Sequence, residues 1–494
     1  MSEFRKSTVT GVGWVVGERV GRSALQFLVM ACLARLLDPQ DFGLVGMILV
    51  FTGFAGLFSD FGLSAALVQR EVIEERHYSS VFWVNVGIGV ALAALLSVLA
   101  PLIAAFYTEP RLTSMTRVVA LGFVFSSLST VQRARLQRAM DFRLLTKVEL
   151  LSAGGAGAVA VGVALAGGGV WSLIWEGLAA SCLAAVIFWL VAAWRPRFMF
   201  DRKALADLFW FGGNLLGFSV LNYWIRNVDK MLIGKVMGSA KLGIYGRAYS
   251  LMLLPLTQIT SVLSRVMFPA MSRIQKDPMR VKRVFLRTVA AIALITFPMM
   301  LGALVTAEHI VLTVYGPQWL SAVPVFKILC LLGMLQSIVS STGWIYLSQG
   351  RTDWFFWWGA GAGVLLIGSI VLGVWLGTIE AVAACYTLMS GVILLYPAIA
   401  IPGRLVGLRF GEVAAAVSPT LACSVAMATV VLGVGLIMPV GWPHWLILCF
   451  QVPVGIAVYG LLLHVFRLTA YLDVRRVGIE HLEAWLPSRA KFFA

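Results

Sequence analysis

Four polar side chains recur at regular intervals inside one apolar stretch, residues 215–246. The positions i, i+4, i+7 and i+8 are held by Asn222, Arg226, Asp229 and Lys230. A helix places all four on one face. Ionisable groups facing lipid cost several kcal/mol, so this face is expected to look into a protein or water-filled interior. Arg226 and Lys230 could bind an anion there with Asp229 as a partner, although Lys230 could instead reach the membrane interface.

A second charged face lies near the N-terminus. The apolar span 11–36 contains Glu18, Arg19 and Arg22. Glu18 and Arg22 are four residues apart and can pair along a helix. Two interpretations remain open: a structural ion pair that holds neighbouring helices, or a cationic substrate-binding site in which Glu18 holds the arginines in place.

Single carboxylates occur in two further apolar spans. Asp60 lies toward one end of the second span, and Glu176 is central in the sixth. Either could bind a coupling proton or sodium ion, and either could simply neutralise a neighbouring cation. The six cysteines show no CxxC pair and the five histidines no HExxH motif, so we expect no metal site and no cofactor.

The sign of the charged faces indicates a substrate class, because the cations outnumber the anions on them. A cavity for cationic drugs should be acidic, whereas one for phosphorylated head groups should present arginine and lysine. A diphosphate-linked lipid cannot cross hydrocarbon with its charges exposed. A guanidinium-lined groove open to lipid on one side would lower that barrier. The pattern favours an anionic amphiphile.

The composition is that of a membrane protein built from many helices. Of the 494 residues 60% are hydrophobic and 13% are charged, and the mean hydropathy is +0.89. A soluble domain is nearer half apolar and a quarter charged. The net charge of +16 does not indicate nucleic-acid binding, because the basic residues lie mostly in alternate connections between apolar spans.

About fourteen spans are long enough to cross a bilayer, at roughly 20 residues each. Their expected limits are 11–36, 41–68, 79–106, 113–135, 145–167, 169–194, 206–236, 240–268, 284–306, 322–347, 353–376, 378–401, 413–437 and 444–466. Even-numbered connections are rich in arginine and lysine and odd-numbered ones are nearly bare. This asymmetry predicts that both termini are cytoplasmic.

Two segments resemble each other and predict an internal duplication. The sequence DFGLVG at 41–46 matches KLGIYG at 241–246. We expect an all-α polytopic membrane protein with two pseudo-symmetric six-helix lobes and two appended C-terminal helices, as many transporters are built. The expected parts are an N-lobe at 1–195, a basic cytoplasmic linker at 196–205, a second lobe at 206–403, two helices at 404–466 and a cytoplasmic interfacial tail at 467–494.

Four stretches carry a family resemblance: NVDKMLIGKVMGSAKLGIYGRA, LQRAMDFRLLTKVE, GGGVWSLIWEGLA and VYGPQW. In this order they resemble the polysaccharide-exporter branch of the MOP flippases, the Wzx and WzxC-like proteins. The resemblance covers spans one to twelve and implies two lobes forming a V around a central cavity. It also implies alternating access, with cavity-lining cations at Arg19 and Arg22 and, by position, at Arg226 and Lys230.

The resemblance further implies a flippase that carries undecaprenyl-diphosphate-linked oligosaccharide across a bacterial inner membrane for lipopolysaccharide, capsule or exopolysaccharide synthesis. A polysaccharide polymerase and chain-length machinery are the expected protein partners. The rival of the same architecture is a small-molecule antiporter of the MATE type, which an acidic interior would favour. A membrane enzyme is not expected, because no connection is long enough to form a catalytic domain.

Overall fold

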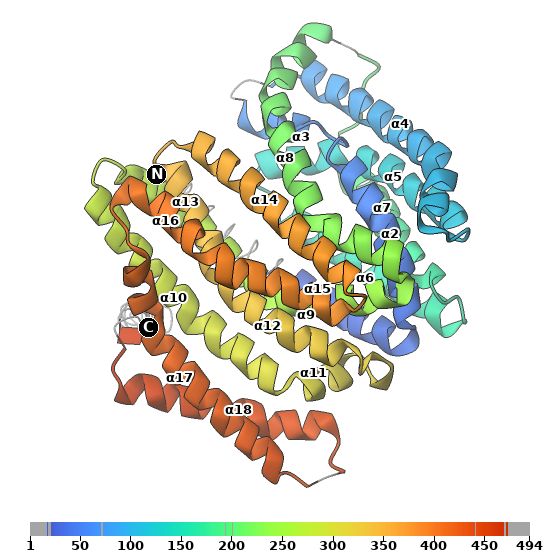
Figure 1. Ribbon diagram of the computed structural model, residues 1–494. Coiled ribbons are helices and arrows are strands. Elements are labelled where there is room, and N and C mark those ends of the chain that lie inside the picture. Colours follow the sequence, from blue (N-terminus) through green and yellow to red (C-terminus); the bar gives the residue numbers. More distant parts are fainter. Residues whose placement is uncertain are drawn as a thin grey trace, which may run out of the picture. The chain divides into compact units, whose positions relative to one another are not determined.

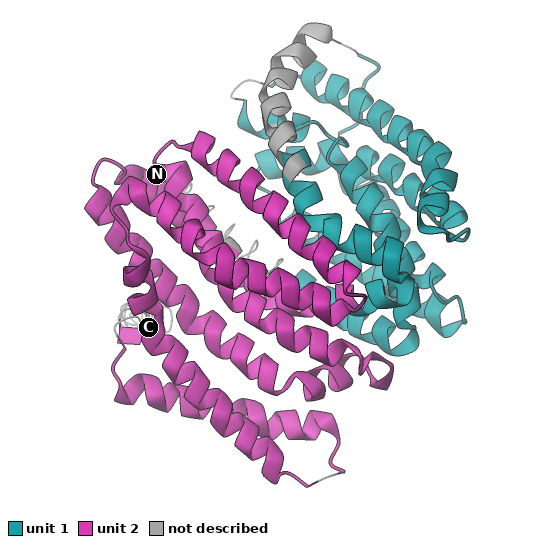
Figure 2. Cartoon of the chain, viewed as in Figure 1, with its two compact units in different colours: residues 1–244 teal, residues 245–494 magenta. Residues whose placement is uncertain are grey.

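The computed structural model describes residues 17, 21–70, 73–192, 194–199, 201–439, 441–468 and 471–472. Within these ranges the side chains at 65, 202–218, 221, 261–262 and 265 are not described. The described chain is helical throughout and contains no strand, which confirms the all-α prediction. Backbone groups in hydrocarbon must be satisfied within their own segment, and a helix does this. The chain divides into two compact units, at residues 1–244 and 245–494 (Figure 2).

Unit 1 begins with a helix described from residue 21 to 36, here called the first helix. It continues through α2 (Pro39–Gly56), α3 (Leu63–Gln69), α4 (Glu75–Tyr107), α5 (Leu112–Arg138), α6 (Phe142–Leu165), α7 (Trp171–Val191), α8 (Arg202–Met237) and the start of α9 (Ser239–Arg273) (Figure 1). The most extensive packing joins α4 to α5, α6 to α7 and α5 to α7. Helix α8 packs against α2, α3 and α4.

Unit 2 holds the rest of α9 and the remaining helices. They are α10 (Pro278–Val305), α11 (Ala307–Val314), η1 (Pro317–Trp319), α12 (Ala322–Val339), η2 (Ser340–Thr342), α13 (Gly343–Ser348), α14 (Thr352–Trp375), α15 (Ile379–Leu388), η3 (Met389–Ile393), α16 (Leu395–Val406), α17 (Phe410–Ile437) and α18 (His444–Val465). One core cluster of unit 2 joins α9, α10, α12, α13, α16 and α17 around Phe285 and Trp344.

Eleven helical segments in the described part are long and apolar enough to cross a membrane. The protein is therefore a multi-pass membrane protein. The three other expected spans, 11–36, 206–236 and 240–268, coincide with the first helix, α8 and α9. The total of fourteen spans stays a prediction.

The second expected span, 41–68, was wrong in one respect, because it is broken in the structure. Helix α2 ends at Gly56 and α3 begins at Leu63. The Asp60 carboxylate accepts hydrogen bonds from the Ser64 amide (3.1 Å) and hydroxyl (2.8 Å), and Gly62 adopts a left-handed φ of 75°. A side-chain acceptor before a helix favours a new helix start, and glycine adopts the positive φ of the preceding bend at little cost.

The two resembling segments contact each other within unit 1. A Cβ atom added at Gly43 would lie 1.7 Å from the Ser239 carbonyl oxygen, and one added at Gly243 would lie 1.8 Å from the Pro39 carbonyl oxygen. Each glycine contacts the residue two positions before the other segment. Such a reciprocal pattern is expected when related surfaces pack about a two-fold axis. This reciprocal contact supports an internal duplication.

The chain passes from unit 1 to unit 2 within α9, so the seventh expected span, α8, belongs to unit 1 by its contacts. The expected lobes were divided at 196–205 instead. That division stays a prediction. Compact units are defined by contacts within one conformation, whereas transport lobes are defined as the parts that move together. The expected interfacial tail lies almost wholly outside the described residues.

Candidate functional site

The first helix and α6 lie side by side in unit 1. Atoms of Leu150 lie 3.6 Å from a Cβ built on Gly21, and an atom of Leu25 lies 3.7 Å from one built on Gly154. At Gly157 a Cβ would come within 2.4 Å of Val29, so the absence of a side chain permits this approach. Residue numbers rise together along both helices. The two therefore run in the same direction, as the first and fifth spans of one membrane protein must.

This pairing brings together three charged side chains from three helices. Arg22 Nη1 donates to Glu149 Oε2 at 2.9 Å, and Arg133 Nη2 of α5 lies 2.7 Å from Glu149 Oε1. Each carboxylate oxygen thus holds one guanidinium. The Arg133 guanidinium carbon also lies 5.8 Å from the centroid of the Phe188 ring of α7. We call Arg22, Arg133 and Glu149 the arginine–glutamate triad.

The triad has a net charge of +1 and is accessible on its cationic side. The Glu149 side chain is only 9% exposed, whereas those of Arg22 and Arg133 are 42% and 40% exposed. Among the described residues, each arginine uses one of its five N–H groups to bind the Glu149 carboxylate. Guanidinium groups with N–H donors to spare are suited to bind phosphate oxygens.

Of the expected first-helix residues, Arg22 belongs to the triad, while Glu18 and Arg19 lie outside the described residues. Glu149 and Arg133 were missed. A carboxylate about one turn inside the apolar span 145–167 was the available signal for Glu149. From the sequence, Arg133 was counted only among the basic residues of an even-numbered connection, with no binding role assigned to it.

The four α8 residues lie on one continuous helix but differ in exposure. Arg226 Nε donates to Asn222 Oδ1 at 3.2 Å, which confirms the i, i+4 proximity, and both side chains are exposed. Lys230 Nζ donates to Asn227 Oδ1 at 3.2 Å and is half-buried, whereas Asp229 is buried. The four expected side chains therefore occupy different environments, and their role in binding substrate stays a prediction.

The two single carboxylates also have neighbours. Besides Ser64, Asp60 Oδ1 accepts from Asn85 Nδ2 of α4 at 3.0 Å, so Asp60 ties the start of α3 to α4. Glu176 of α7 is half-buried and interacts with other groups. Ion coupling at either position stays a prediction.

Two further pairs of titratable groups lie at or beyond the ends of the candidate spans. Glu109 and Arg111, between α4 and α5, form two parallel bonds of 2.7 and 3.0 Å, and this contact lowers the pKa of Glu109. In unit 2, His309 Nδ1 of α11 lies 2.9 Å from His444 Nδ1 at the start of α18. Burial, followed by the nearby His444, lowers the pKa of His309 below its usual 6.5.

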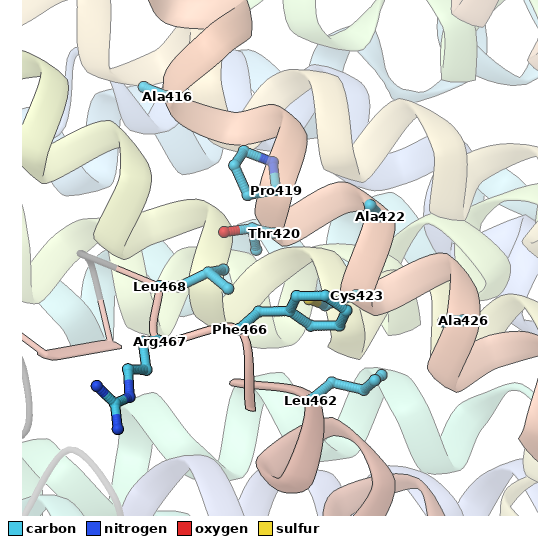
Figure 3. Close-up of a pocket in the computed structure, with 10 residues that line it drawn as sticks. All are labelled: Ala416, Pro419, Thr420, Ala422, Cys423, Ala426, Leu462, Phe466, Arg467 and Leu468. Atoms are coloured by element: carbon cyan, nitrogen blue, oxygen red, sulfur yellow. The ribbon is translucent and has the colours of Figure 1, made fainter. Parts of the chain in front are cut away.

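Unit 2 also contains a cavity of about 530 Å³ beside α17 and α18 (Figure 3). Its walls are mostly small or apolar side chains, including Pro419, Cys423 and Phe466, with Arg467 at its border. Such a lining offers little to bind a charged head group. The triad is therefore the candidate functional site of the described chain.

Comparison with known proteins gives a consistent result. The model of a family described as "Polysaccharide biosynthesis protein" matches residues 32–324. The teichuronic acid biosynthesis protein TuaB of Bacillus subtilis (strain 168) is 29% identical, over 79% of this chain and 81% of that protein. The succinoglycan biosynthesis transport protein ExoT of Rhizobium meliloti (strain 1021) is 27% identical, over 74% of each chain.

The fold is also similar to a solved structure, that of the lipid II flippase MurJ in an inward closed conformation. The TM-score is 0.74, with 94% of this chain and 99% of that chain covered. The sequence identity is 14%, so the likeness shows a shared fold. It extends over both compact units.

Proposed function

This chain belongs to the polysaccharide biosynthesis protein family, and from that premise we propose that it is a flippase for lipid-linked oligosaccharides. The substrate is an undecaprenyl-diphosphate-linked repeat unit that passes from the cytoplasmic to the periplasmic leaflet of a bacterial inner membrane. A relative named as a transport protein and a solved fold named as a lipid flippase support this activity. The transport step is alternating access, with no covalent change to the substrate.

The observation that carries the proposal is the arginine–glutamate triad. Two guanidinium groups fixed by one carboxylate present N–H donors at a defined separation, which suits the two phosphates of a diphosphate. Arg133 lies five residues before the end of α5, and Glu149 seven residues after the start of α6. At a rise of 1.5 Å per residue these distances are about 8 and 10 Å.

Both helix ends adjoin the connection 139–141, which Arg138 and Arg143 flank and which the charge asymmetry of the sequence predicts to be cytoplasmic. The triad would then lie within the cytoplasmic third of a hydrocarbon layer about 30 Å thick. A head group that enters from the inner leaflet would reach the triad before it reaches the centre of the membrane. The triad is thus placed to receive the diphosphate before the sugars cross.

A small-molecule antiporter of the same architecture is the competing function. A site for organic cations would require a net negative charge, whereas the triad is net positive. The charge therefore favours the lipid-diphosphate substrate.

Binding of undecaprenyl diphosphate to the purified chain in nanodiscs tests the proposal. Replacement of Arg22 or Arg133 by glutamine removes one charge-assisted hydrogen-bonding group, worth about 1.5–3 kcal/mol, so we expect binding to weaken about 10- to 100-fold. Arg117→Gln is the matched control, because Arg117 is an exposed arginine at the other end of α5. Equal affinities for Arg22→Gln, Arg133→Gln and the control would refute the proposal.

Glu149→Gln separates a substrate site from a purely structural ion pair. The exchange leaves two arginines without their shared carboxylate, so the affinity for undecaprenyl diphosphate should rise while the chain becomes less stable to heat. A purely structural triad predicts the loss of stability alone. In cells, Arg22→Gln should cause lipid-linked repeat units to accumulate on the cytoplasmic side at normal protein level.

A further inference from the structure

A second basic pocket lies at one end of unit 1, between helices that do not include the first helix or α6. Its volume is about 440 Å³, and its lining comes from α4, the last turns of α5 and the segment that follows α7. The polar and aromatic lining residues are Tyr78, Gln132, Arg135, Arg138 and Trp194. Arg133, which belongs to the triad, points instead to Glu149 and Phe188. The two sites therefore use different faces of α5.

Arg135 is held in a fixed orientation at this pocket. Its guanidinium carbon lies 5.0 Å from the centroid of the Tyr78 ring and 5.2 Å from that of the Trp194 ring. Trp194 is itself anchored, because its indole N–H donates to the Glu75 carboxylate. An arginine contacted by two aromatic rings loses little further side-chain freedom when it binds a ligand.

Polar atoms in the pocket wall lack hydrogen-bond partners. Gln132 is 1% exposed, and neither its amide nitrogen nor its amide oxygen is bonded to any described residue. The Nη1 atom of Arg135 is also buried without a hydrogen-bond partner in the described chain. Buried polar groups in native proteins are nearly always bonded, so an unbonded set around one cavity indicates a missing ligand.

The charge of the pocket is positive. Arg138 Nη1 donates to the carbonyl oxygens of Leu67 and Arg70 at the end of α3, and so adds a second cation. The end of α7 would bring negative carbonyl dipoles. Arg195 donates hydrogen bonds to the carbonyl oxygens of Ala192 and Trp189 at this helix end, and its positive charge offsets their negative dipoles. Glu75, the nearby carboxylate, is bonded to Trp194.

We propose that this pocket binds the phosphate group of an anionic membrane phospholipid. Arg135 Nη1 and the Gln132 amide N–H donate to phosphate oxygens, and the Gln132 amide oxygen accepts from a head-group hydroxyl. Basic pockets between membrane helices on the cytoplasmic side are suited to such head groups. Trp194 and Tyr78 are residue types enriched at that interface. The site is independent of the transported molecule.

Native mass spectrometry of the full chain in detergent tests this assignment, with phosphatidylglycerol and phosphatidylcholine as the probes. The wild type should retain one phosphatidylglycerol and release phosphatidylcholine. Arg135→Gln should weaken that retention about tenfold or more, because a charge-assisted bond is lost. Arg143→Gln is the matched control, an exposed arginine of the following α6 start that does not line the pocket. Equal retention in the two variants would overturn the proposal.

Gln132→Leu provides a second variant that leaves the Arg135 ring contacts intact. It removes a buried amide that has no partner when lipid is absent, so its thermal stability in lipid-free detergent should rise. Added phosphatidylglycerol should stabilise the wild type but not this variant. If lipid stabilises both equally, the amide is not part of the site.

Excess inorganic phosphate distinguishes the two sources of a phosphate group. Phosphatidylglycerol should stay bound to the wild type in its presence, because the lipid is held by its chains as well as its head group. Displacement by inorganic phosphate would overturn the lipid assignment in favour of a soluble phosphate ligand. Arg22→Gln should retain phosphatidylglycerol, which keeps this test separate from that of the flippase.

Discussion

Replacement of Gly43 by alanine should strongly destabilise unit 1. The added Cβ atom would lie 1.7 Å from the Ser239 carbonyl oxygen and 2.4 Å from its carbonyl carbon. Real Cβ atoms essentially never approach a heavy atom closer than 3.0 Å. The backbone of α2 or α9 must therefore shift by about 1.3 Å, since no flexible side chain can move aside. That shift also disturbs the reciprocal contact of Gly243 with Pro39.

The size of the effect follows from this geometry. Overpacking a core costs about 1–3 kcal/mol, and a clash with backbone belongs at the upper end, near 3 kcal/mol. For a domain of 150–250 residues each kcal/mol lowers the melting temperature by about 2–4 °C. Unit 1 contains 244 residues, so we expect a decrease of about 6–12 °C.

Gly246→Ala is the matched control because it makes the same change in the second copy of the motif. No atom lies within 4 Å of a Cβ built at Gly246. An alanine there should be neutral or stabilise the helix by up to about 1 kcal/mol. Thermal unfolding of the three proteins in one detergent measures the difference. Identical melting temperatures for Gly43→Ala and Gly246→Ala would refute the close crossing of the repeated segments.

Three further outcomes are expected. If Arg226 contacts the diphosphate as predicted, Arg226→Glu should reduce glycan export more than Arg226→Ala, because it reverses the charge at that contact; equal export would assign Arg226 a packing role. The neutral form of His309 is favoured in the fold, so stability should be full above pH 6.5 and fall as the pH drops through its lowered pKa. Thermal unfolding of His309→Gln should depend less on pH over that range. Tyr223→Phe removes hydrogen bonds to the carbonyl oxygens of Leu49 (3.1 Å) and Val50 (2.7 Å) and should cost about 1 kcal/mol, whereas the same change at exposed Tyr396 should cost nothing measurable.

Helix limits could be predicted closely from hydropathy alone. The expected span 79–106 corresponds to α4 at Glu75–Tyr107, and 413–437 to α17 at Phe410–Ile437. The break between α2 and α3 was missed because it depends on the local bonds of Asp60 and on the φ of Gly62. A window of about 20 residues averages over such a short interruption.

The candidate site could be predicted only in part. Arg22 was identified because a charge inside an apolar span must have a polar environment. Its partners depend on which helices lie side by side, and this information is not contained in the periodicity of one segment. Gly157 permits the close approach of α6 to Val29, but this role can be recognised only once α6 is placed beside the first helix.

The shared carboxylate explains how one site could both bind and release a diphosphate. Two arginines inside the membrane without a counter-charge would be costly to hold there and would bind a diphosphate too tightly to let it leave. Glu149 stabilises both guanidinium groups in the empty protein and competes with the phosphate oxygens for the same N–H donors. Because the carboxylate is buried and the arginines are partly exposed, the proposed substrate would contact the two cations before the carboxylate. A triad of net charge +1 would therefore attract the proposed head group and still release it.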